Sequence, residues 1–351
     1  MQKSDHYPIL EMVNSASKVL KAYETLGKIS EVEIGTSPKD QVFQNDKLRL
    51  FRYQRETPPS VKTPVLIVYA LVNRFEMLDL QPDRSYIRNL LNLGLDVYII
   101  DWGYPTRADR YNDLDDYVNG FINSCVDFIR HEHSLEKINL MSVCQGGTLS
   151  SIYSALHPEK VKNLVTLVTP IDFSANDGLL FRWAKDMDFD ALVDGYGGLI
   201  PGEFLNIGFE LLKPMMKFNK YNGMLQMLDD ADKLSNFLRM EKWIADSPDQ
   251  AGECFRQFMK ELYQGNKLVK GKLRVGNHLV DLKNIKMPLL NIYATEDHLV
   301  PPSSTIPLNH LVGSTDKELY KFQGGHIGVF VGGKSQKELA PAVAAWLKKR
   351  D

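Results

Sequence analysis

Short apolar segments that alternate with helical patterns restrict the fold of this chain more than any other feature of its sequence. Five of them are rich in β-branched residues and bounded by Gly, Pro, Asp or Asn: residues 65–69, 97–101, 138–143, 164–168 and 289–293. Nearly unbroken apolar runs of this length are typical of parallel strands buried on both faces. Helical spacing of apolar residues occurs between them, for example at 86–93 and 117–130. The alternation predicts an α/β fold, with a mostly parallel sheet flanked by helices and right-handed crossovers.

The pattern changes near both ends and in the middle of the chain. Residues 47–53 predict an antiparallel edge strand, and 338–349 predict a C-terminal amphipathic helix that carries Trp346. Between 174 and 282 the sequence is rich in Met, Phe and Leu and shows no convincing strand. Connections between strands and helices are usually only a few residues long, so we interpret this stretch as an insertion.

The insertion has two interpretations. It supplies either extra packing helices or a largely helical cap over the carboxyl edge of the sheet. We favour the cap, because ligands bind at that edge in α/β folds. The expected division is therefore a core of residues 1–173 and 283–351 and a cap of residues 174–282.

Composition excludes several classes of function. A chain of 351 residues with a formal net charge of -2 at pH 7 has no strongly basic surface, which argues against a nucleic-acid partner. Three scattered cysteines are too few for a disulfide framework or a metal-binding knuckle, so we predict no metal site and a reducing, cytoplasmic location. The first residues lack the pattern of a signal peptide, and the longest apolar run, 65–72, is far shorter than the ~20 residues of a membrane span.

One predicted strand leads into a motif of nucleophilic enzymes. After the strand at 138–143, the sequence Ser142-Val143-Cys144-Gln145-Gly146 precedes a helical pattern, which is the context of the G-x-S-x-G nucleophile elbow. Cys144 takes the place of the nucleophile, and the backbone N–H of Gln145 is a predicted oxyanion donor at a helix N-terminus. Gly146 and Gly147 let the strand and the helix approach closely. The alternative is a buried structural cysteine, since free Cys behaves as a small hydrophobe.

An acid and a base that could serve such a nucleophile follow it in the chain. Their order, nucleophile, then Asp, then His, is the one that α/β-hydrolases use. Asp297 lies in the turn after the strand at 289–293, with Glu296 and His298 as its nearest competitors. His326 follows a strand and a Gly-Gly loop, which gives an imidazole room to reach Cys144. We therefore predict an α/β-hydrolase fold with a Cys144–His326–Asp297 triad.

Two neighbouring loops are predicted to complete the site. The backbone N–H of Val72, in the loop after 65–69, is the expected second oxyanion donor, with Leu71 as second choice. Asp101 and Trp102 end another strand near the site and either shape the pocket or hold the sheet together. The remaining cysteines, Cys125 and Cys254, are expected to be core residues, and His278 and His310 to be solvated.

The chain resembles one known family, the short, two-subunit (class III) polyhydroxyalkanoate synthases. The likeness extends from about residue 37 to 349 and includes the segments VYALVNR, IDWGYP, LDDYVNGFI, VCQGGT, YSALHPEKVKNLVT, VTPIDF, NFLRMEKWIADSPDQAGECFRQF, EDHLVPP and GGHIGVFV. In that family a modified lipase box supplies the catalytic cysteine, which maps to Cys144, and the triad maps to Asp297 and His326. The family's box usually begins with Gly, so Ser142 is a departure.

The resemblance implies a reaction and partners. Such synthases polymerise (R)-3-hydroxyacyl-CoA, mainly 3-hydroxybutyryl-CoA, into a polyester and release CoA without a cofactor. An acyl-Cys stays activated because transfer between two thioesters is nearly thermoneutral. His326 would deprotonate Cys144, and Asp297 would either orient His326 or help it activate a 3-hydroxyl group. The family also implies a second, non-catalytic subunit, a homodimer and attachment to cytoplasmic polyester granules; residues 9–27 are either a docking helix or an ordinary core helix.

Two other functions remain as alternatives. A cysteine hydrolase of the dienelactone-hydrolase kind would use the same elbow with water as the acceptor, but the long apolar cap favours exclusion of water. A granule-coating protein without activity would have no use for the Cys, Asp and His set.

Overall fold

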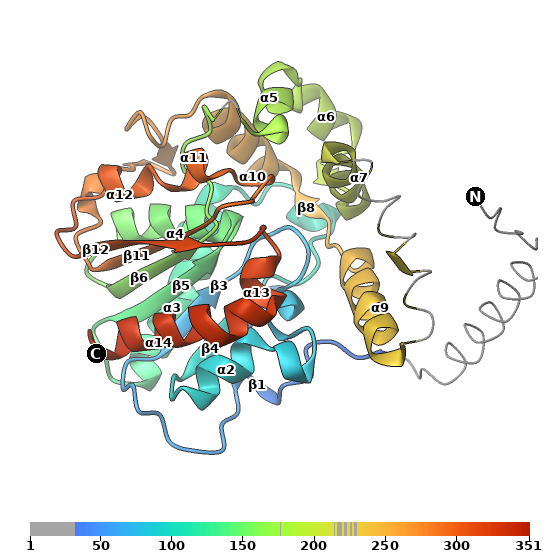
Figure 1. Ribbon diagram of the computed structural model, residues 1–351. Coiled ribbons are helices and arrows are strands. Elements are labelled where there is room, and N and C mark those ends of the chain that lie inside the picture. The colour runs from blue at the N-terminus through green and yellow to red at the C-terminus, as the bar shows by residue number, and fades with distance from the viewer. Residues whose placement is uncertain are drawn as a thin grey trace, which may run out of the picture.

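The structure is a computed structural model, which describes residues 32–175, 177–213, 215, 220, 223–224, 227 and 230–351. An eight-stranded sheet forms the centre of the molecule. Its strands, in spatial order, are β1 (Lys39–Asn45), β2 (Leu48–Tyr53), β4 (Val97–Asp101), β3 (Val65–Val68), β5 (Ile138–Val143), β6 (Val161–Leu167), β11 (Leu289–Ala294) and β12 (Lys317–Phe322). Strands β1 and β2 are antiparallel to their neighbours, and the other six run parallel (Figure 1).

The five parallel strands predicted from apolar runs are confirmed as β3, β4, β5, β6 and β11. Every residue of β3, β4 and β5 is buried, which explains why their sequences lack alternation. The predicted antiparallel strand is confirmed as β2, but its place at the edge is wrong, because β1 lies outside it. Polar residues make up most of β1 (KDQVFQN), so its pattern gave no strand signal.

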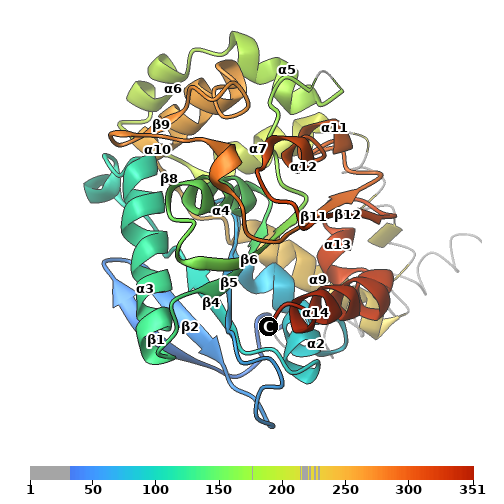
Figure 2. The same ribbon diagram turned by 90° about the vertical axis from the view of Figure 1, so that its left-hand side faces the viewer.

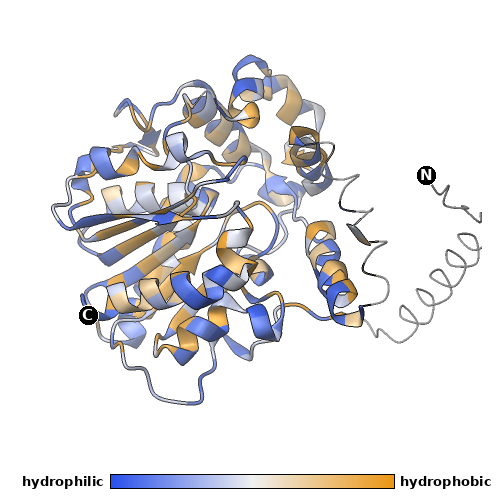
Figure 3. Ribbon diagram, viewed as in Figure 1, coloured by the Kyte–Doolittle hydropathy of each residue, from blue (hydrophilic) through white to orange (hydrophobic). Residues whose placement is uncertain are grey.

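Helices cover both faces of the sheet. Helices α3 (Asn123–Glu132) and α4 (Gln145–Leu156) contribute to the apolar cluster on one face, and α2 (Tyr86–Asn92) and α14 (Ala340–Lys348) to the cluster on the other. Figure 2 shows α3 and α14 on opposite sides of the strands. In Figure 3 hydrophobic residues concentrate along the central strands. Burial of these two clusters is the main force that holds the layers together.

The predicted helices are found, with additional turns. A π-helical turn, η4 (Asp116–Ile122), precedes α3, and a second one, η7 (Ser335–Leu339), precedes α14. Trp346 of α14 is buried, as expected of the core-facing residue of an amphipathic helix. Residues 9–27, for which a helix was considered, lie outside the described residues.

The described part of residues 174–282 is mainly helical. It contains α5 (Leu179–Asp186), α6 (Phe189–Gly195), α7 (Gly202–Leu212), α9 (Ala231–Ala245), α10 (Gly252–Gln257) and the π-helical η5 (Phe258–Gln264). Two pairs of very short strands were not predicted: β7 (Leu199–Ile200) with β8 (Gln250–Ala251), and β9 (Arg274–Val275) with β10 (His278–Leu279). Among the described residues, no helix has the length and apolarity needed to cross a membrane.

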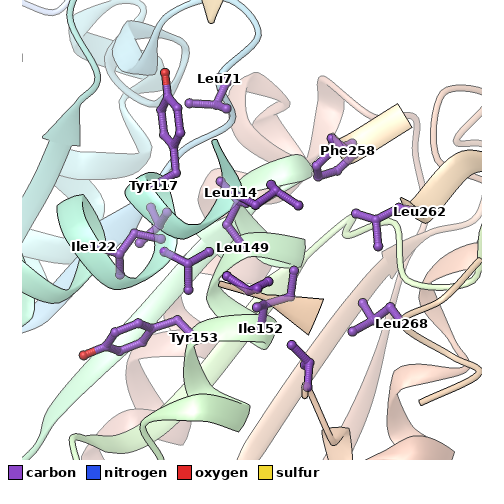
Figure 4. Packing of buried hydrophobic residues seen from close by; sticks show 14 of the residues in the cluster. Leu71, Leu114, Tyr117, Ile122, Leu149, Ile152, Tyr153, Phe258, Leu262 and Leu268 are labelled. Carbon is purple, nitrogen blue, oxygen red and sulfur yellow. The ribbon is translucent and has the colours of Figure 1, made fainter. Parts of the chain in front are cut away.

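The segment 174–282, for which a cap was predicted and which is called the cap below, shares one hydrophobic cluster with the rest of the chain. Phe258 and Leu262 of η5 belong to the same buried cluster as Leu149 and Ile152 of α4 (Figure 4). All four are at most 3% exposed. The part of the cap near η5 is therefore packed onto the helix that follows Cys144, instead of standing apart from it.

Candidate functional site

Cys144 occupies a sharp turn between β5 and α4. Its backbone has φ 52° and ψ -125°, a conformation that non-glycine residues rarely adopt and that costs about 1–3 kcal/mol. Two hydrogen bonds hold the turn: Cys144 N donates to the Leu167 carbonyl oxygen at 2.9 Å, and Gly147 N donates to the Cys144 carbonyl oxygen at 2.8 Å. The surrounding structure therefore fixes the thiol at the carboxyl end of the sheet.

The glycines that follow Cys144 allow this close approach. A Cβ on Gly146 would lie 2.3 Å from the Val68 carbonyl oxygen, and one on Gly147 would lie 1.9 Å from Thr169 Oγ1. Helix α4 thus touches the ends of β3 and β6 without room for side chains at these two positions. Ser142 is fully buried, and its hydroxyl donates to the Val165 carbonyl oxygen at 3.1 Å. The hydroxyl that distinguishes Ser142 from Gly is therefore satisfied within the sheet.

Asp297 and His326 form a buried pair beside the elbow. Asp297 Oδ2 lies 2.6 Å from His326 Nδ1. The other carboxylate oxygen of Asp297 accepts hydrogen bonds from the backbone N–H groups of Leu299 and Val300, both at 2.9 Å. With both oxygens engaged, the carboxylate has one orientation, and it fixes the tautomer and direction of the imidazole.

The charge of His326 depends on both of its partners. Burial alone would lower the pKa of His326, but the Asp297 carboxylate and then a Cys144 thiolate raise it to about 10, through charge and through hydrogen bonds to both side chains. His326 therefore bridges Asp297 and Cys144. An imidazole held between a carboxylate and a thiol is placed to accept the thiol proton.

The competing residues in the Asp297 turn have other environments. Glu296 is exposed, and its backbone N–H donates to the Gly324 carbonyl oxygen at 2.9 Å, which ties this turn to the His326 loop. His298 is half-buried, and burial followed by the charge of Lys213 lowers its pKa. Of the acidic residues in this turn, Asp297 is the one in contact with His326.

The two predicted oxyanion donors, the backbone N–H groups of Gln145 and Val72, differ from the second choice, Leu71, in their hydrogen bonding. Gln145 begins α4, and its side-chain Oε1 accepts a hydrogen bond from Leu71 N at 3.1 Å. Leu71, the second choice from the sequence, is therefore engaged. Within the described ranges, the backbone N–H groups of Val72 and Gln145 have no acceptor. The lack of an acceptor is compatible with the predicted role of both groups as oxyanion donors.

Asp101 and Trp102 hold loops together, and both also line a cavity beside the loop that follows β3. Asp101 Oδ1 accepts from Arg74 Nη1 and from Gly103 N, both at 3.0 Å. Trp102 Nε1 donates to the Tyr69 carbonyl oxygen at 3.0 Å. The hydrogen bonds fit the structural interpretation from the sequence, and the position in the cavity wall fits the pocket interpretation. Arg74 was missed, although a basic residue close behind the long apolar run of residues 65–72 was a visible signal.

Two buried tyrosines, Tyr69 and Tyr263, are affected by the charge of Cys144. Burial, and then the charge of a Cys144 thiolate, raise the pKa of Tyr69 at the end of β3 and of Tyr263 in η5. Tyr263 also lies against Phe173, with ring centroids 4.7 Å apart, and against Phe181 at 5.2 Å. Tyr263 is therefore part of a packed aromatic group in and next to the segment 174–282.

The other cysteines and histidines singled out in the sequence show no sign of a catalytic role. Cys125 and Cys254 are buried, and burial raises the pKa of both thiols well above the ordinary value, which makes them poor nucleophiles. His278 and His310 are exposed, as expected. No cluster of three or more His, Cys, Asp or Glu side chains suited to a metal ion occurs in the described part of the chain.

Two family descriptions match this chain. The alpha/beta hydrolase fold matches residues 63–333, and the N-terminus of poly-beta-hydroxybutyrate polymerase (PhaC) matches residues 16–90. Solved structures agree on the fold. A monoacylglycerol lipase from Paleococcus ferrophilus has a TM-score of 0.52 at 16% identity, covering 86% of this chain and 99% of that one. An epoxide hydrolase variant from Bacillus megaterium has a TM-score of 0.54 at 12% identity, covering 89% and 100%.

Much closer relatives are curated under one description, poly(3-hydroxyalkanoate) polymerase subunit PhaC. The protein from Allochromatium vinosum is 52% identical over 97% of this chain and 96% of its own length. Those from Thiocystis violacea and Synechocystis sp. are 51% and 49% identical, each over 97% of this chain and over 96% and 92% of their own lengths.

Proposed function

Because the chain belongs to the family of poly(3-hydroxyalkanoate) polymerase subunit PhaC, we propose that it polymerises (R)-3-hydroxyacyl-CoA thioesters through an acyl-Cys144 intermediate. The observation that carries the proposal is the thiol itself, held in a strained elbow next to the buried Asp297–His326 pair. A serine esterase of the same fold would hold its acyl group as an oxygen ester. A thioester at Cys144 keeps the acyl group activated for transfer to a hydroxyl.

Acylation is the first step. His326 takes the proton of Cys144, and the thiolate attacks the thioester carbonyl carbon. The backbone N–H groups of Val72 and Gln145 stabilise the resulting oxyanion, because both are free of other acceptors among the described residues. When the oxyanion collapses, the bond between carbon and the CoA sulfur breaks, and the CoA thiolate leaves with the proton held on His326. The acyl group then resides on Cys144.

Chain transfer is the second step. A 3-hydroxyl group attacks the acyl-Cys144 carbonyl, an ester bond forms, and the bond to the Cys144 sulfur breaks. The hydroxyl proton passes to His326 and then restores the thiol. Asp297 supports both steps, since its carboxylate stabilises the imidazolium that forms in each of them. Tyr69 and Tyr263 are both buried, and a site lined by buried side chains disfavours water as the competing acceptor.

We further propose the finer properties that the family resemblance implies. The preferred substrate is 3-hydroxybutyryl-CoA, and the active form is a homodimer that works with a second, non-catalytic subunit. The enzyme acts in the cytoplasm at the surface of its polyester granules. No cofactor takes part, because thiol, imidazole and carboxylate account for every proton and bond in the two steps.

A product analysis tests the proposal. The protein is incubated with 3-hydroxybutyryl-CoA, with and without a candidate partner subunit, and CoA, polymer and free hydroxy acid are measured together. We expect CoA release to match polymer formation, with more of both when the partner is present. Equimolar CoA and free 3-hydroxybutyrate without polymer would instead establish a cysteine hydrolase. Binding to polyester particles without CoA release would establish a coat protein.

A further inference from the structure

The carboxyl end of cap helix α9 and the residues after it meet the loop that follows β3. Trp243 Nε1 donates to the Arg74 carbonyl oxygen at 2.7 Å, and Asn73 Nδ2 donates to Ser247 Oγ. Asp246 Oδ2 lies 3.8 Å from Arg74 Nε. The Trp243 ring is 5% exposed and belongs to the apolar cluster of the core. Helix α9, which stands along the side of the core in Figure 1, is thus anchored to this loop through its last turn.

Arg74 is the centre of a buried group of charges at this junction. Its side chain is 8% exposed, and its guanidinium donates to Asp101 Oδ1 at 3.0 Å and to Glu76 Oε1 at 3.1 Å. The Tyr104 ring stacks on it at 4.8 Å, and the Tyr104 hydroxyl donates to Asp246 Oδ1 at 2.7 Å. A buried cation needs all such partners, because its desolvation is expensive without them. Arg74 therefore joins β4, the loop after β3 and the cap.

The same loop carries one of the two free oxyanion donors. Leu71 N is bonded to Gln145 of the elbow, and Asn73, which has a left-handed φ of 56°, bonds to the cap residue Ser247. Val72 lies between these two fixed neighbours. The position of its N–H therefore depends on the elbow on one side and on the cap on the other.

Resting on the function proposed above, we propose that Arg74 is a positioning residue that seats the cap on this loop, so that the oxyanion hole is complete only when α9 is docked. Donors must lie about 3 Å from the developing oxyanion to stabilise it. A shift of about 1 Å in a reacting group costs up to a hundredfold in rate. Loss of the Arg74 contacts releases the loop and lets the Val72 N–H move by such distances, although Arg74 itself touches no reacting atom.

Two variants and a matched control test the proposal. Arg74→Met keeps most of the side-chain stem and removes the charge, and Trp243→Phe keeps an aromatic ring and removes the N–H that binds the Arg74 carbonyl. Arg52→Met is the control, because Arg52 makes an equivalent fork to Asp96, at 3.1 Å and 2.7 Å, just before the start of β4. For each protein, kcat and KM for 3-hydroxybutyryl-CoA and the rate of Cys144 alkylation by iodoacetamide are measured. Alkylation forms no oxyanion, so it reports on the thiol and His326 alone.

We expect Arg74→Met to lower kcat by about tenfold to a hundredfold, with KM within threefold and alkylation within twofold of wild type. Trp243→Phe should show the same split with a smaller loss, and it decides the matter if Arg74→Met does not fold. Arg52→Met should leave all three quantities unchanged. The proposal would be overturned if Arg74→Met and Trp243→Phe both fold and keep the kcat of wild type. It would also be overturned if the rate of Cys144 alkylation falls as much as kcat does. Wild-type protein that yields hydroxy acid instead of polymer would refute the proposed function alone, because hydrolysis needs the same oxyanion hole.

Discussion

Gly146→Ala is a sharp test of the elbow, because the structure sets the size of its effect. The new Cβ would lie 2.3 Å from the Val68 carbonyl oxygen and 2.6 Å from the Tyr69 carbonyl oxygen. Both are backbone atoms at the carboxyl end of β3, so no side-chain rotation relieves the clash. Ordinary contact begins near 3.4 Å, so α4 has to move by about 1 Å and carry Cys144 with it. Overpacking of this kind costs about 1–3 kcal/mol of stability, and a 1 Å displacement of the nucleophile costs about a hundredfold in rate.

Gly120→Ala is the matched control for this substitution. Gly120 lies in η4, where an added Cβ meets nothing within 4 Å. We expect this change to raise the free energy of unfolding by ~0.5–1 kcal/mol and to leave the rate unchanged. Urea unfolding and CoA release are measured on both variants. A Gly146→Ala protein with the stability and rate of wild type would show that α4 is not packed against β3 as described.

Three further predictions concern the residues around the thiol. His326→Gln should lower CoA release by several orders of magnitude, and it should change the pH dependence of stability. The pKa of His326 is raised from 6.5 to about 10, so its stabilising contribution is complete below pH 6.5 and lost as the pH rises through 10. The free energy of unfolding of wild type, measured with urea, should therefore exceed that of His326→Gln by a smaller amount as the pH rises across that range. A difference that stays constant with pH would refute the assignment. Asp297→Asn should impair elongation more than single-turnover acylation, because a thiol needs less help than an alcohol, and equal losses would contradict this. Ser142→Gly should keep CoA release within roughly tenfold of wild type, since the lost bond to Val165 is worth about 1 kcal/mol.

The sequence predicted those parts of the molecule whose signals are local. Strands β3 and β5 are recognisable because every one of their residues is buried, and the elbow because a strand, a turn with two glycines and a helix follow one another directly. Asp297 and His326 were predicted from chain order and loop composition, and the structure brings their side chains together. The exposed strand β1 was missed, since its polar residues carry no strand pattern.

Contacts between distant segments were beyond prediction. Arg74 pairs with Asp101, 27 residues away, and its carbonyl binds Trp243, 169 residues away. Neither pairing leaves a periodicity in the chain. The Gln145 side chain is a similar case: the motif predicts its backbone N–H, but its bond to Leu71 depends on how β3 and α4 are placed relative to each other.

The central claim is that a covalent acyl group resides on Cys144 during polymer formation. The most direct measurement is to quench wild-type protein and Cys144→Ala during turnover of radiolabelled 3-hydroxybutyryl-CoA, digest both, and locate the label by peptide mapping. The account predicts label on the Cys144 peptide of the wild type and none on the variant, which should also release no CoA although it remains folded. Label on Cys125 or Cys254 that persists in Cys144→Ala would contradict the account.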